Sequence, residues 1–409
     1  MSTFGQQNAV PAVIQRGGTS RGVYFHTRDM PPHGPRRDAL LTRLMGSPDV
    51  VQIDGLGGSR PITSKIAIIE ASDRPDADVD YTFGQVKIAE PGVDWAGNCG
   101  NISSGVGAFA VDEGLVEAVE PVTTVRIFNT NTRAILVAQV PVVDGKSAVL
   151  GDFSIPGVPG TGAEIVMNWA GTIGAVTGTL LPTGRPRDEI TLDDGSTVGA
   201  TLCDAGNPSV WVPAADAGLS GSELTELNDP KILARVREIR GRAAQLLGFC
   251  DDWHDADSTT AVLPLIGFVA PPASYTTLNG AHVDEAEMDL RLRVIFMQQL
   301  HESTPGTGSI SLAAASRIPD TTVYDAVADH ERDELRIGHP SGVTPTKVKA
   351  VRVDGDPGVE FELLGFGRTS RRIMDSTAYV PVDTLDDVPE TEVDDPSHGV
   401  VSDDTPGTR

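Results

Sequence analysis

A run of small residues that follows a glycine turn occurs twice in this chain and constrains its fold more than any other feature. The first copy, residues 99–111, reads CGNISSGVGAFAV, and the second, residues 305–315, reads PGTGSISLAAA. Side chains this small suit a helix that strands approach closely, so each copy predicts a central helix inside a curved sheet. Two such halves would make an internal repeat. Chance similarity between Gly, Ser and Ala stretches is the alternative, and the residues alone leave both open.

Short β-like segments separated by Gly and Pro make up much of the remaining chain, whose 409 residues leave room for two domains. Apolar residues at helical spacing predict two packing helices. One covers residues 229–247, with Asp229 as its N-cap and Gly248 as its stop, and the other covers residues 284–300. The expected strands include residues 12–15, 22–25, 64–69, 124–128 and 134–140.

The chain is strongly acidic, with 57 Asp and Glu against 32 Lys and Arg and a formal net charge of −25. Such a surface repels nucleic acid and anionic membranes, so neither is an expected partner. The acidic excess with few lysines is typical of a halophilic protein, and an ordinary acidic protein is the alternative. Residues 383–409 are acidic, rich in Pro and poor in bulky apolar residues, which predicts a disordered, solvating tail.

The number of cysteines and the N-terminal residues indicate the cellular compartment of the protein. Cys99, Cys203 and Cys250 are too few and too widely spaced for a disulfide framework, and without a Cys-x-x-Cys pair a structural zinc site is not expected. The first residues lack the basic and apolar pattern of a signal segment, and no apolar run approaches the roughly 20 residues of a membrane helix. We therefore expect a cytoplasmic protein that binds no metal.

Cys99 is a candidate reactive residue because it directly precedes the first small-residue helix. Unpaired backbone N–H groups and the positive end of the helix dipole favour a thiolate and also bind carboxylates. A buried, inert cysteine is the alternative. The polar neighbours Asn98 and Asn101 argue against an apolar pocket around it.

Two glycine-rich loops carry further candidates. Residues 16–22 read RGGTSRG, and their hydroxyls and arginine suit carboxylate binding, although an ordinary tight turn has the same composition. Residues 54–65 read DGLGGSRPITSK and deliver Lys65 at the head of an apolar strand. A lysine there usually extends into solvent, but in a chain with six lysines it is equally a candidate base, since a desolvated lysine can release its proton near neutral pH.

We interpret the other polar clusters as parts of loops and turns and not as binding or catalytic sites. The acidic stretch 251–257 could bind a cation, but in so acidic a chain a surface loop is the better interpretation. His339 lies in a turn by composition, and no Ser/His/Asp or Cys/His triad is recognisable.

Taken together, these segments resemble the 2-methylaconitate cis-trans isomerase (PrpF) family, whose relatives include 4-oxalomesaconate tautomerases and aconitate isomerases. The resemblance covers residues 8 to 382. Its matching motifs, which occur in the family's order, are residues 17–25 (GGTSRGVYF), 64–67 (SKIA), 94–101 (DWAGNCGN), 204–208 (DAGNP), 339–342 (HPSG) and 368–374 (RTSRRIM).

The resemblance implies a diaminopimelate epimerase-like fold of two pseudo-symmetric α/β domains, with the active site in the interdomain cleft. It places the first domain at residues 1–120 plus 365–382 and the second at 121–364. In epimerases each half offers a cysteine above its central helix. Here Cys99 matches in the first half, but Pro305 stands at the second position, which argues against a symmetrical two-cysteine racemase.

The activity that the resemblance implies is an allylic proton shift on an unsaturated tricarboxylate, 2-methylaconitate or a similar aconitate, without a cofactor. The family's catalytic lysine and cysteine map onto Lys65 as the principal base and Cys99 as the partner acid/base. Hydroxyls, arginines and helix N-terminal amides are expected to bind the substrate's carboxylates. These binding residues are Thr19, Ser20, Arg21, Arg60, Ser64, Asn98, Gly100, Asn101, Asn207, Thr307, Gly308 and Ser309.

Other functions remain open at this stage. A 4-oxalomesaconate tautomerase belongs to the same family, and a racemase-type enzyme shares the fold. A polycarboxylate-binding accessory protein to an aconitase-type dehydratase would bind the ligand without turnover. Functional coupling to such a dehydratase and assembly as a homodimer are left open as well, as is the order of proton transfer between Lys65 and Cys99.

Overall fold

The computed structural model divides the chain into two units, Met1–Met167 with Arg368–Arg409 and Asn168–Gly367. The predicted boundary at 364 lies close to the second division, at Gly367, whereas the predicted boundary at 120 lies before the first, at Met167. The segment after the first central helix stays in unit 1 because its strands pair with that unit's sheet. The structure describes residues 2–95, 98–155, 157–224, 229–260, 263–296, 299–355 and 357–390.

Unit 1 is a sheet with two helices, α1 (Pro35–Met45) and α2 (Gly100–Asp112). Single 3-10 turns occur at Thr27–Asp29, Pro61–Thr63 and Val382–Leu385. Its strands are β1 (Ser2–Phe4), β2 (Gln7–Gly17), β3 (Ser20–His26), β4 (Lys65–Ala71), β5 (Val79–Val86), β6 (Val93–Asp94), β7 (Val122–Asn129), β8 (Ala134–Val143), β9 (Lys146–Ser147) and β22 (Ser370–Pro381), and β10 (Ile165–Asn168) covers the boundary.

Unit 2 has the same kind of construction, with helices α3 (Pro230–Leu246), α4 (Ala256–Thr259), α5 (Gly306–Ala315) and α6 (Thr322–Ala326). Its 3-10 turns are Ala170–Thr172, Ala214–Ala217, Trp253–Asp255 and Glu285–Glu287. Its strands are β11 (Asp188–Thr191), β12 (Thr197–Ala205), β13 (Asn207–Pro213), β14 (Leu265–Ala270), β15 (Tyr275–Thr276), β16 (His282–Val283), β17 (Leu290–Phe296), β18 (Gln299–Leu300), β19 (Glu334–His339), β20 (Gly342–Arg352) and β21 (Val359–Arg368).

The strand pairings of the two units follow one pattern. In unit 1, β2 to β3 is antiparallel, β3 to β4 parallel, β4 to β5 antiparallel, β5 to β7 parallel and β7 to β8 antiparallel. In unit 2, the strands β12, β13, β14, β17, β19 and β20 repeat this alternation in the same order. Helices α2 and α5 occupy equivalent places in the two series, so the internal repeat is confirmed and the α/β fold class with it.

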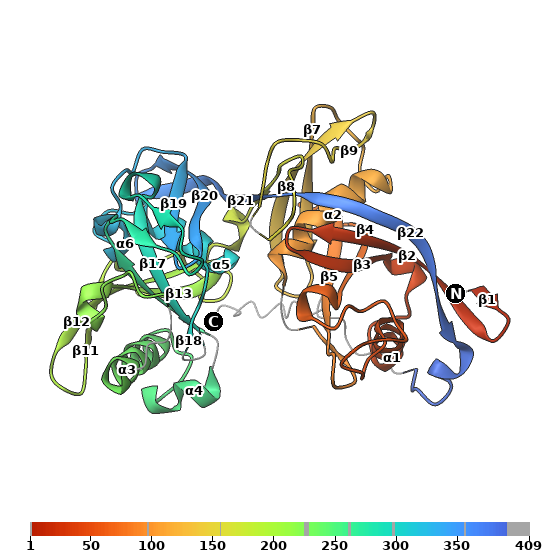
Figure 1. Cartoon of the computed structure of the whole chain (residues 1–409), viewed down its shortest axis with the longest axis horizontal. Coiled ribbons are helices and arrows are strands. Elements are labelled where there is room, and N and C mark those ends of the chain that lie inside the picture. Colours follow the sequence, from red (N-terminus) through yellow and green to blue (C-terminus); the bar gives the residue numbers. More distant parts are fainter. Residues whose placement is uncertain are drawn as a thin grey trace, which may run out of the picture. The chain divides into compact units, whose positions relative to one another are not determined.

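Both small-residue runs form the central helices that were predicted. Helix α2 contacts the strands β2, β3, β4, β5, β7, β8 and β9 and the returning β22, and Figure 1 shows it among the strands of this unit. Every residue of α2 from Ile102 to Val111 is buried. In α5 the residues from Gly308 to Ala315 are buried as well, against β12, β13 and β20. Side chains no larger than these let the strands come close on several sides.

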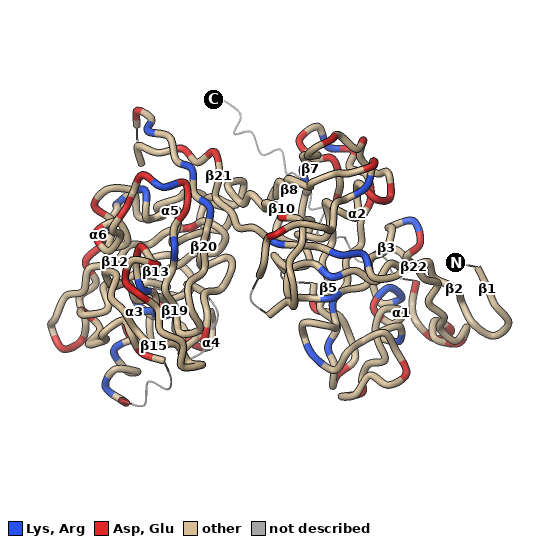
Figure 2. Tube along the Cα trace, turned by 45° about the horizontal axis from the view of Figure 1, so that its top comes forward, with Lys and Arg blue, Asp and Glu red and all other residues tan. Residues whose placement is uncertain are grey.

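Larger apolar side chains lie on the outer helices. In unit 1, Leu40, Leu41 and Leu44 of α1 pack against the sheet core. In unit 2, α3 covers the sheet and begins as predicted, with the Asp229 carboxylate accepting from the Lys231 amide at 2.8 Å. Among the described residues, no helix is both long and apolar enough to cross a membrane. Figure 2 shows acidic residues spread over the loops of both units.

The helix predicted over residues 284–300 is wrong. The structure has the turn Glu285–Glu287 followed by strands β17 and β18. The apolar residues of this stretch fit both the spacing of a helix and that of a strand. The buried Leu290, Leu292 and Val294 alternate with the period of a strand, and that pattern is the one the structure adopts. Strand β17 pairs with β14 on one side and with β19 on the other, and this pairing in the sheet decides the conformation.

The predicted tail is ordered at its start. Residues 383–390 are described, and Leu385 is 6% exposed within the core of unit 1, so disorder from residue 383 is wrong. Leu385 lies four residues after the last strand, and burial of its side chain holds the segment in place. Residues 391–409 lie outside the described part of the chain.

An Asp–Arg ion pair also recurs at equivalent places in the two units. In unit 1 the backbone amide of Arg126 donates to the Asp78 carboxylate at 2.7 Å, and its Nη2 donates to the same group at 2.7 Å. In unit 2 Arg336 makes the same two bonds to Asp289, at 2.8 and 2.7 Å. Both aspartates directly precede a strand, β5 or β17, and both arginines lie on its parallel neighbour. The pair therefore ties two parallel strands together beside the crossover that contains the central helix.

The two copies differ in burial, which predicts different contributions to stability. The Asp289 side chain is 1% exposed, whereas Asp78 is 27% exposed and its partner arginine 43%. Removing one partner of a buried pair costs about 3 kcal/mol, and of an exposed pair about 1 kcal/mol or less. We expect Asp289→Ala to lower the urea midpoint, followed by circular dichroism, much more than Asp78→Ala. Equal shifts for the two variants would contradict this reading.

Candidate active site

Lys65 is the first residue of β4 and lies directly after the glycine-rich loop. Its Nζ donates to Oε1 of Gln85 at 2.8 Å and lies 5.0 Å from the centre of the Phe83 ring. Among the described residues, Lys65 forms no ion pair. Its side chain is half-buried, so the amine is close to solvent while one neutral amide holds its position.

The side chain of Lys65 lies on the face of the sheet that α2 covers. Lys65 pairs with Gly22 on β3, and a Cβ added to Gly22 would approach Ile102 of α2 at 3.0 Å. Two residues further along β3, the Tyr24 hydroxyl donates to the Ile102 carbonyl at 2.9 Å. Because side chains in register share a face, Lys65 is directed toward the same helix. Glycine at position 22 leaves space between Lys65 and that helix.

Cys99 is the N-cap residue of α2. The carboxamide oxygen of Asn98 accepts from the Cys99 amide at 2.6 Å and from the Ser103 hydroxyl at 2.9 Å, which fixes the entry to the helix. The first helical hydrogen bond runs from the Ser103 amide to the Cys99 carbonyl at 2.9 Å. The amides of Gly100 and Asn101 precede that bond and are therefore available to an anion.

The side-chain NH₂ group of Asn98 is a hydrogen-bond donor that suits a ligand. Its Nδ2 atom is buried and has no hydrogen-bond partner within the described parts of the chain. An unpaired buried donor is costly unless something accepts from it, so a bound carboxylate oxygen would relieve that cost.

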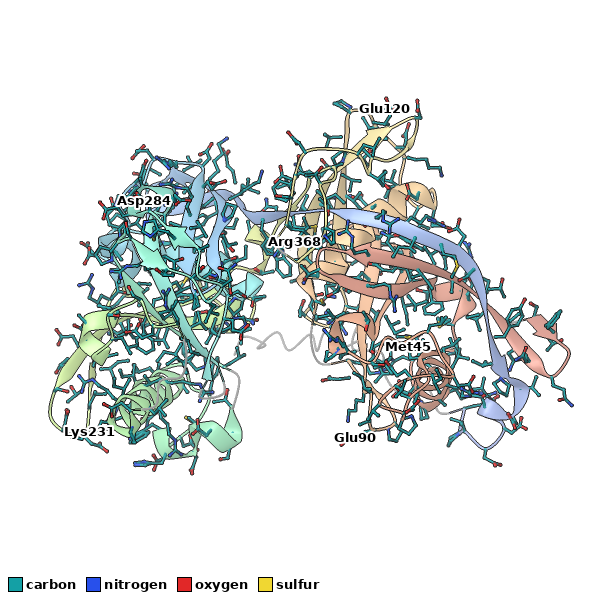
Figure 3. The ribbon with its side chains drawn as sticks, in the orientation of Figure 1. Met45, Glu90, Glu120, Lys231, Asp284 and Arg368 are labelled. Atoms are coloured by element: carbon teal, nitrogen blue, oxygen red, sulfur yellow. The ribbon has the colours of Figure 1, made fainter. Side chains whose placement is uncertain are left out.

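Asn101 joins the first glycine loop to α2. Its Nδ2 donates to the Thr19 hydroxyl at 2.9 Å, and its Oδ1 accepts from Nε of Arg368 at 3.2 Å. Arg368, labelled in Figure 3, connects β21 with the returning β22. Burial lowers the pKa of Arg368 to about 10, and the charge of the Cys99 thiolate acts in the opposite direction. A guanidinium thus lies in the electrostatic environment of the thiol.

The second glycine loop wraps around the side chain of Gln52. The carboxamide oxygen of Gln52 accepts from the Ser59 amide at 2.9 Å and from the Ser64 hydroxyl at 2.8 Å. Gly57 lies directly over this amide, because a Cβ there would be 2.2 Å from it. Ser64, expected to bind substrate, is fully buried and supports the loop instead.

The remaining expected residues of unit 1 divide into two groups. Ser20 is buried beside the Thr19 turn, and Arg21 is half-buried with its guanidinium next to Gly58. Arg60 is exposed. The structure therefore brings together Thr19, Ser20, Lys65, Asn98, Cys99, Gly100 and Asn101 around one end of α2. It leaves Arg21, Arg60 and Ser64 at the second glycine loop, because Arg21 alternates to the face of β3 opposite to Gly22 and Tyr24.

The four expected residues of unit 2 gather in the same way at the start of α5. Asn207 donates to the Thr307 hydroxyl at 3.1 Å, which mirrors the bond between Asn101 and Thr19. Gly308 is buried, and the Ser309 hydroxyl donates to the Gly306 carbonyl at 2.7 Å. Pro305 is the N-cap residue of this helix. Unit 2 thus repeats the turn and the helix end without the thiol.

The other sequence candidates are structural. Asp257 of the acidic stretch pairs with Arg237 and Arg240, and Asp252 pairs with His254. No group of three or more metal-ligating side chains lies together within the described residues. His339 bonds to Thr344, and burial lowers its pKa to about 4, so its imidazole is neutral at neutral pH.

Sequence reasoning missed two side chains at this site, Arg368 and Gln85. Arg368 opens one of the resembling motifs, so its position was visible but its contact with Asn101 was not, since 267 residues separate the two. Gln85 gave no signal beyond its place in a strand, and only the register of β4 with β5 puts it opposite Lys65.

The electrostatic effect of Arg368 predicts the reactivity of Cys99. The two groups interact electrostatically, and a nearby positive charge attracts the anionic sulfur that attacks an alkylating reagent. We expect Arg368→Gln to slow iodoacetamide alkylation of Cys99 at neutral pH by roughly tenfold. The background is Cys250→Ser, and the buried Cys203, whose pKa burial raises to about 12, stays unreactive.

Arg371→Gln is the matched control, because Arg371 is exposed and the charge change is identical. Arg368→Lys keeps the charge and is expected to restore much of the rate. An unchanged rate in a folded Arg368→Gln protein would remove Arg368 from the environment of the thiol.

Comparison with known proteins supports one family. Residues 7–381 match the family model described as PrpF protein. The chain is 43% identical to the 3-methylitaconate isomerase of Eubacterium barkeri, over 91% of this chain and 98% of that protein. It is 38% identical to a 2-methyl-aconitate isomerase of Shewanella oneidensis, over 92% and 98%.

A solved structure agrees with these relatives. The crystal structure of methylitaconate-delta-isomerase superposes on the chain with a TM-score of 0.88 at 42% identity, covering 93% of this chain and 97% of that one. The family match spans both units and all six resembling motifs. The chain is therefore a member of the PrpF family and an isomerase.

Proposed function

We propose that the protein is a cofactor-independent isomerase that shifts the double bond of an unsaturated polycarboxylate by allylic proton transfer. The observation that carries this proposal is the placement of Lys65 and Cys99. Lys65 lies on the face of the sheet that α2 covers, and Cys99 caps the N-terminal end of that helix. The Lys65 amine is held by a neutral amide rather than by a carboxylate.

In the proposed mechanism, the neutral amine of Lys65 removes a proton from the carbon next to the double bond. The electron pair of that C–H bond enters the allyl system, and negative charge develops on the conjugated carboxylate. The thiol of Cys99 then gives a proton to the far end of the allyl system, which leaves the double bond in its new place. Transfer of the proton from the Lys65 ammonium to the Cys99 thiolate, directly or through water, restores the starting state.

Donors around the end of α2 stabilise the charge that develops in this mechanism. The amides of Gly100 and Asn101 face the N-terminal side of the helix, and Asn98 has a free buried donor there. Arg368 adds a positive charge. Preorganised donors of this kind contribute much of an enzyme's rate acceleration. The end of α5, with Asn207, Thr307, Gly308 and Ser309, offers a carboxylate site of the same construction.

The substrate is best sought among small methyl-substituted unsaturated acids. The relative at 43% identity is named for 3-methylitaconate and the one at 38% for 2-methyl-aconitate, so these are the first and second candidates. A two-base racemase is disfavoured because Pro305 stands where the second thiol would be and Cys203 is buried within unit 2. Aconitate and 4-oxalomesaconate complete the panel of acids to be assayed.

Substitution of the two proton-transfer groups tests the proposal. We expect Lys65→Ala to lower turnover roughly a thousandfold and Cys99→Ser roughly a hundredfold, in line with the contributions of general bases and acids. The measurement is the ultraviolet absorbance of the unsaturated acid across the panel. Lys87→Ala and Cys250→Ser are matched controls, since Lys87 is exposed and Cys250 lies in unit 2.

Full activity in Lys65→Ala would discard the assigned base, and an unchanged rate in Cys99→Ser would reduce the thiol to a binding group. If calorimetry detects binding of the acids but no member of the panel is converted, the protein is a polycarboxylate-binding accessory protein instead.

A further inference from the structure

The side chain of Gln85 is the hydrogen-bond partner of Lys65, and the sheet places it there. Strands β4 and β5 are antiparallel, and Lys65 and Gln85 are directly opposite one another in their register. The distance from Nζ to Oε1 is 2.8 Å. Both side chains lie on the face toward α2, as does Phe83 two residues before Gln85.

The orientation of the Gln85 amide is fixed by its other contacts. Its Nε2 donates to the Ser64 carbonyl at 2.9 Å and to the Pro61 carbonyl at 3.2 Å. Carbonyl oxygens accept and cannot donate, so the NH₂ group must face them. The oxygen of the amide is thereby directed to Lys65. These two carbonyls belong to the end of the glycine-rich loop, so the loop that delivers Lys65 also orients its partner.

The charged groups around this contact are few. Asp94 on β6 is the next cross-strand neighbour of Gln85 and is exposed. On the other side, Arg21 adjoins Gly22, the β3 partner of Lys65, and Arg60 lies in the preceding loop and is exposed. Gln85 separates Lys65 from Asp94 in the sheet, so the nearest acceptor of the amine is neutral.

A neutral acceptor has a specific consequence for a base. An amine donates a hydrogen bond through N–H whether or not it carries the extra proton, so an amide oxygen holds Nζ in both protonation states. A carboxylate in the same place would favour the ammonium form strongly and oppose its loss of a proton. The lone pair that a base needs is available only in the neutral form.

We propose that Gln85 is a positioning residue for Lys65, which holds the amine through a neutral acceptor so that it can take up and release a proton during turnover. This inference rests on the proposed function of the site for its catalytic meaning. The contact itself is independent of the substrate.

The isosteric substitution Gln85→Glu is the sharpest test, because it changes the acceptor from an amide to a carboxylate. It also removes the bonds to the Ser64 and Pro61 carbonyls, a loss that Gln85→Met reproduces without the charge. We expect turnover at neutral pH to fall roughly tenfold and the alkaline rise of the pH–rate profile to move up by about one pH unit. Gln85→Met removes the acceptor without adding charge, so it is expected to lower kcat with no upward movement of that rise. Gln139→Glu on β8 is the matched control, since Gln139 is exposed.

A second readout needs no substrate. Reductive ¹³C-methylation labels the six lysines and keeps their charge, and the resonance absent from the Lys65→Ala protein identifies Lys65. In Gln85→Glu the titration midpoint of this resonance is expected to move up by about one pH unit, and in Gln139→Glu it is expected to stay.

Movement of both the resonance and the rate profile supports the proposal. An unmoved resonance in a folded Gln85→Glu protein overturns it, whatever the activity. If the resonance moves while the rate profile does not, Gln85 still sets the charge of Lys65, but Lys65 is not the base, and the proposed function of that lysine fails instead.

Discussion

The close packing of strands around a helix of small residues is the constraint on which the rest of unit 1 depends. Every residue of α2 from Ile102 to Val111 is buried, and strands on several sides contact it. A larger side chain anywhere along this stretch would overfill the core and force the strands apart. Because the helix cannot shift, its N-terminus occupies a fixed place at the end of the sheet. Cys99 and the free amides that follow it are therefore held by the core and not by a loop.

The two units share a framework but differ in their chemistry. The order of strand pairings, the central helix, the Asp–Arg pair and the Asn–Thr bond at the helix end are all repeated. Yet Pro305 replaces the thiol at the start of α5, and Cys203 is buried with its thiol directed to the Ser311 carbonyl at 3.6 Å. In the proposed mechanism, proton transfer therefore belongs to unit 1, while unit 2 retains a helix end suited to anions. This asymmetry fits an isomerase that needs a base and an acid of different kinds.

Local patterns in the sequence predicted the elements whose conformation depends on nearby residues. The small-residue helices, the strand that begins at Lys65 and the cap at Asp229 depend on neighbouring residues, and each was placed correctly. The stretch 284–300 was not, because pairing with two distant strands outweighs a helical spacing of apolar residues. The same limit applies to the site. Lys65 and Cys99 became candidates through their motifs. Gln85 and Arg368 come close to them only through strand register and through a strand that returns from the far end of the chain.

Proton exchange with solvent tests the central claim most directly. In heavy water the base and the acid exchange with solvent, so an isomerase that uses Lys65 to remove one proton and Cys99 to deliver another incorporates deuterium. With 3-methylitaconate as substrate, we predict one deuterium at the newly protonated carbon of the product, detected by mass spectrometry. Substrate incubated with the Lys65→Ala protein is predicted to contain no deuterium. Product formed at the full rate without deuterium would contradict a transfer that uses two separate groups.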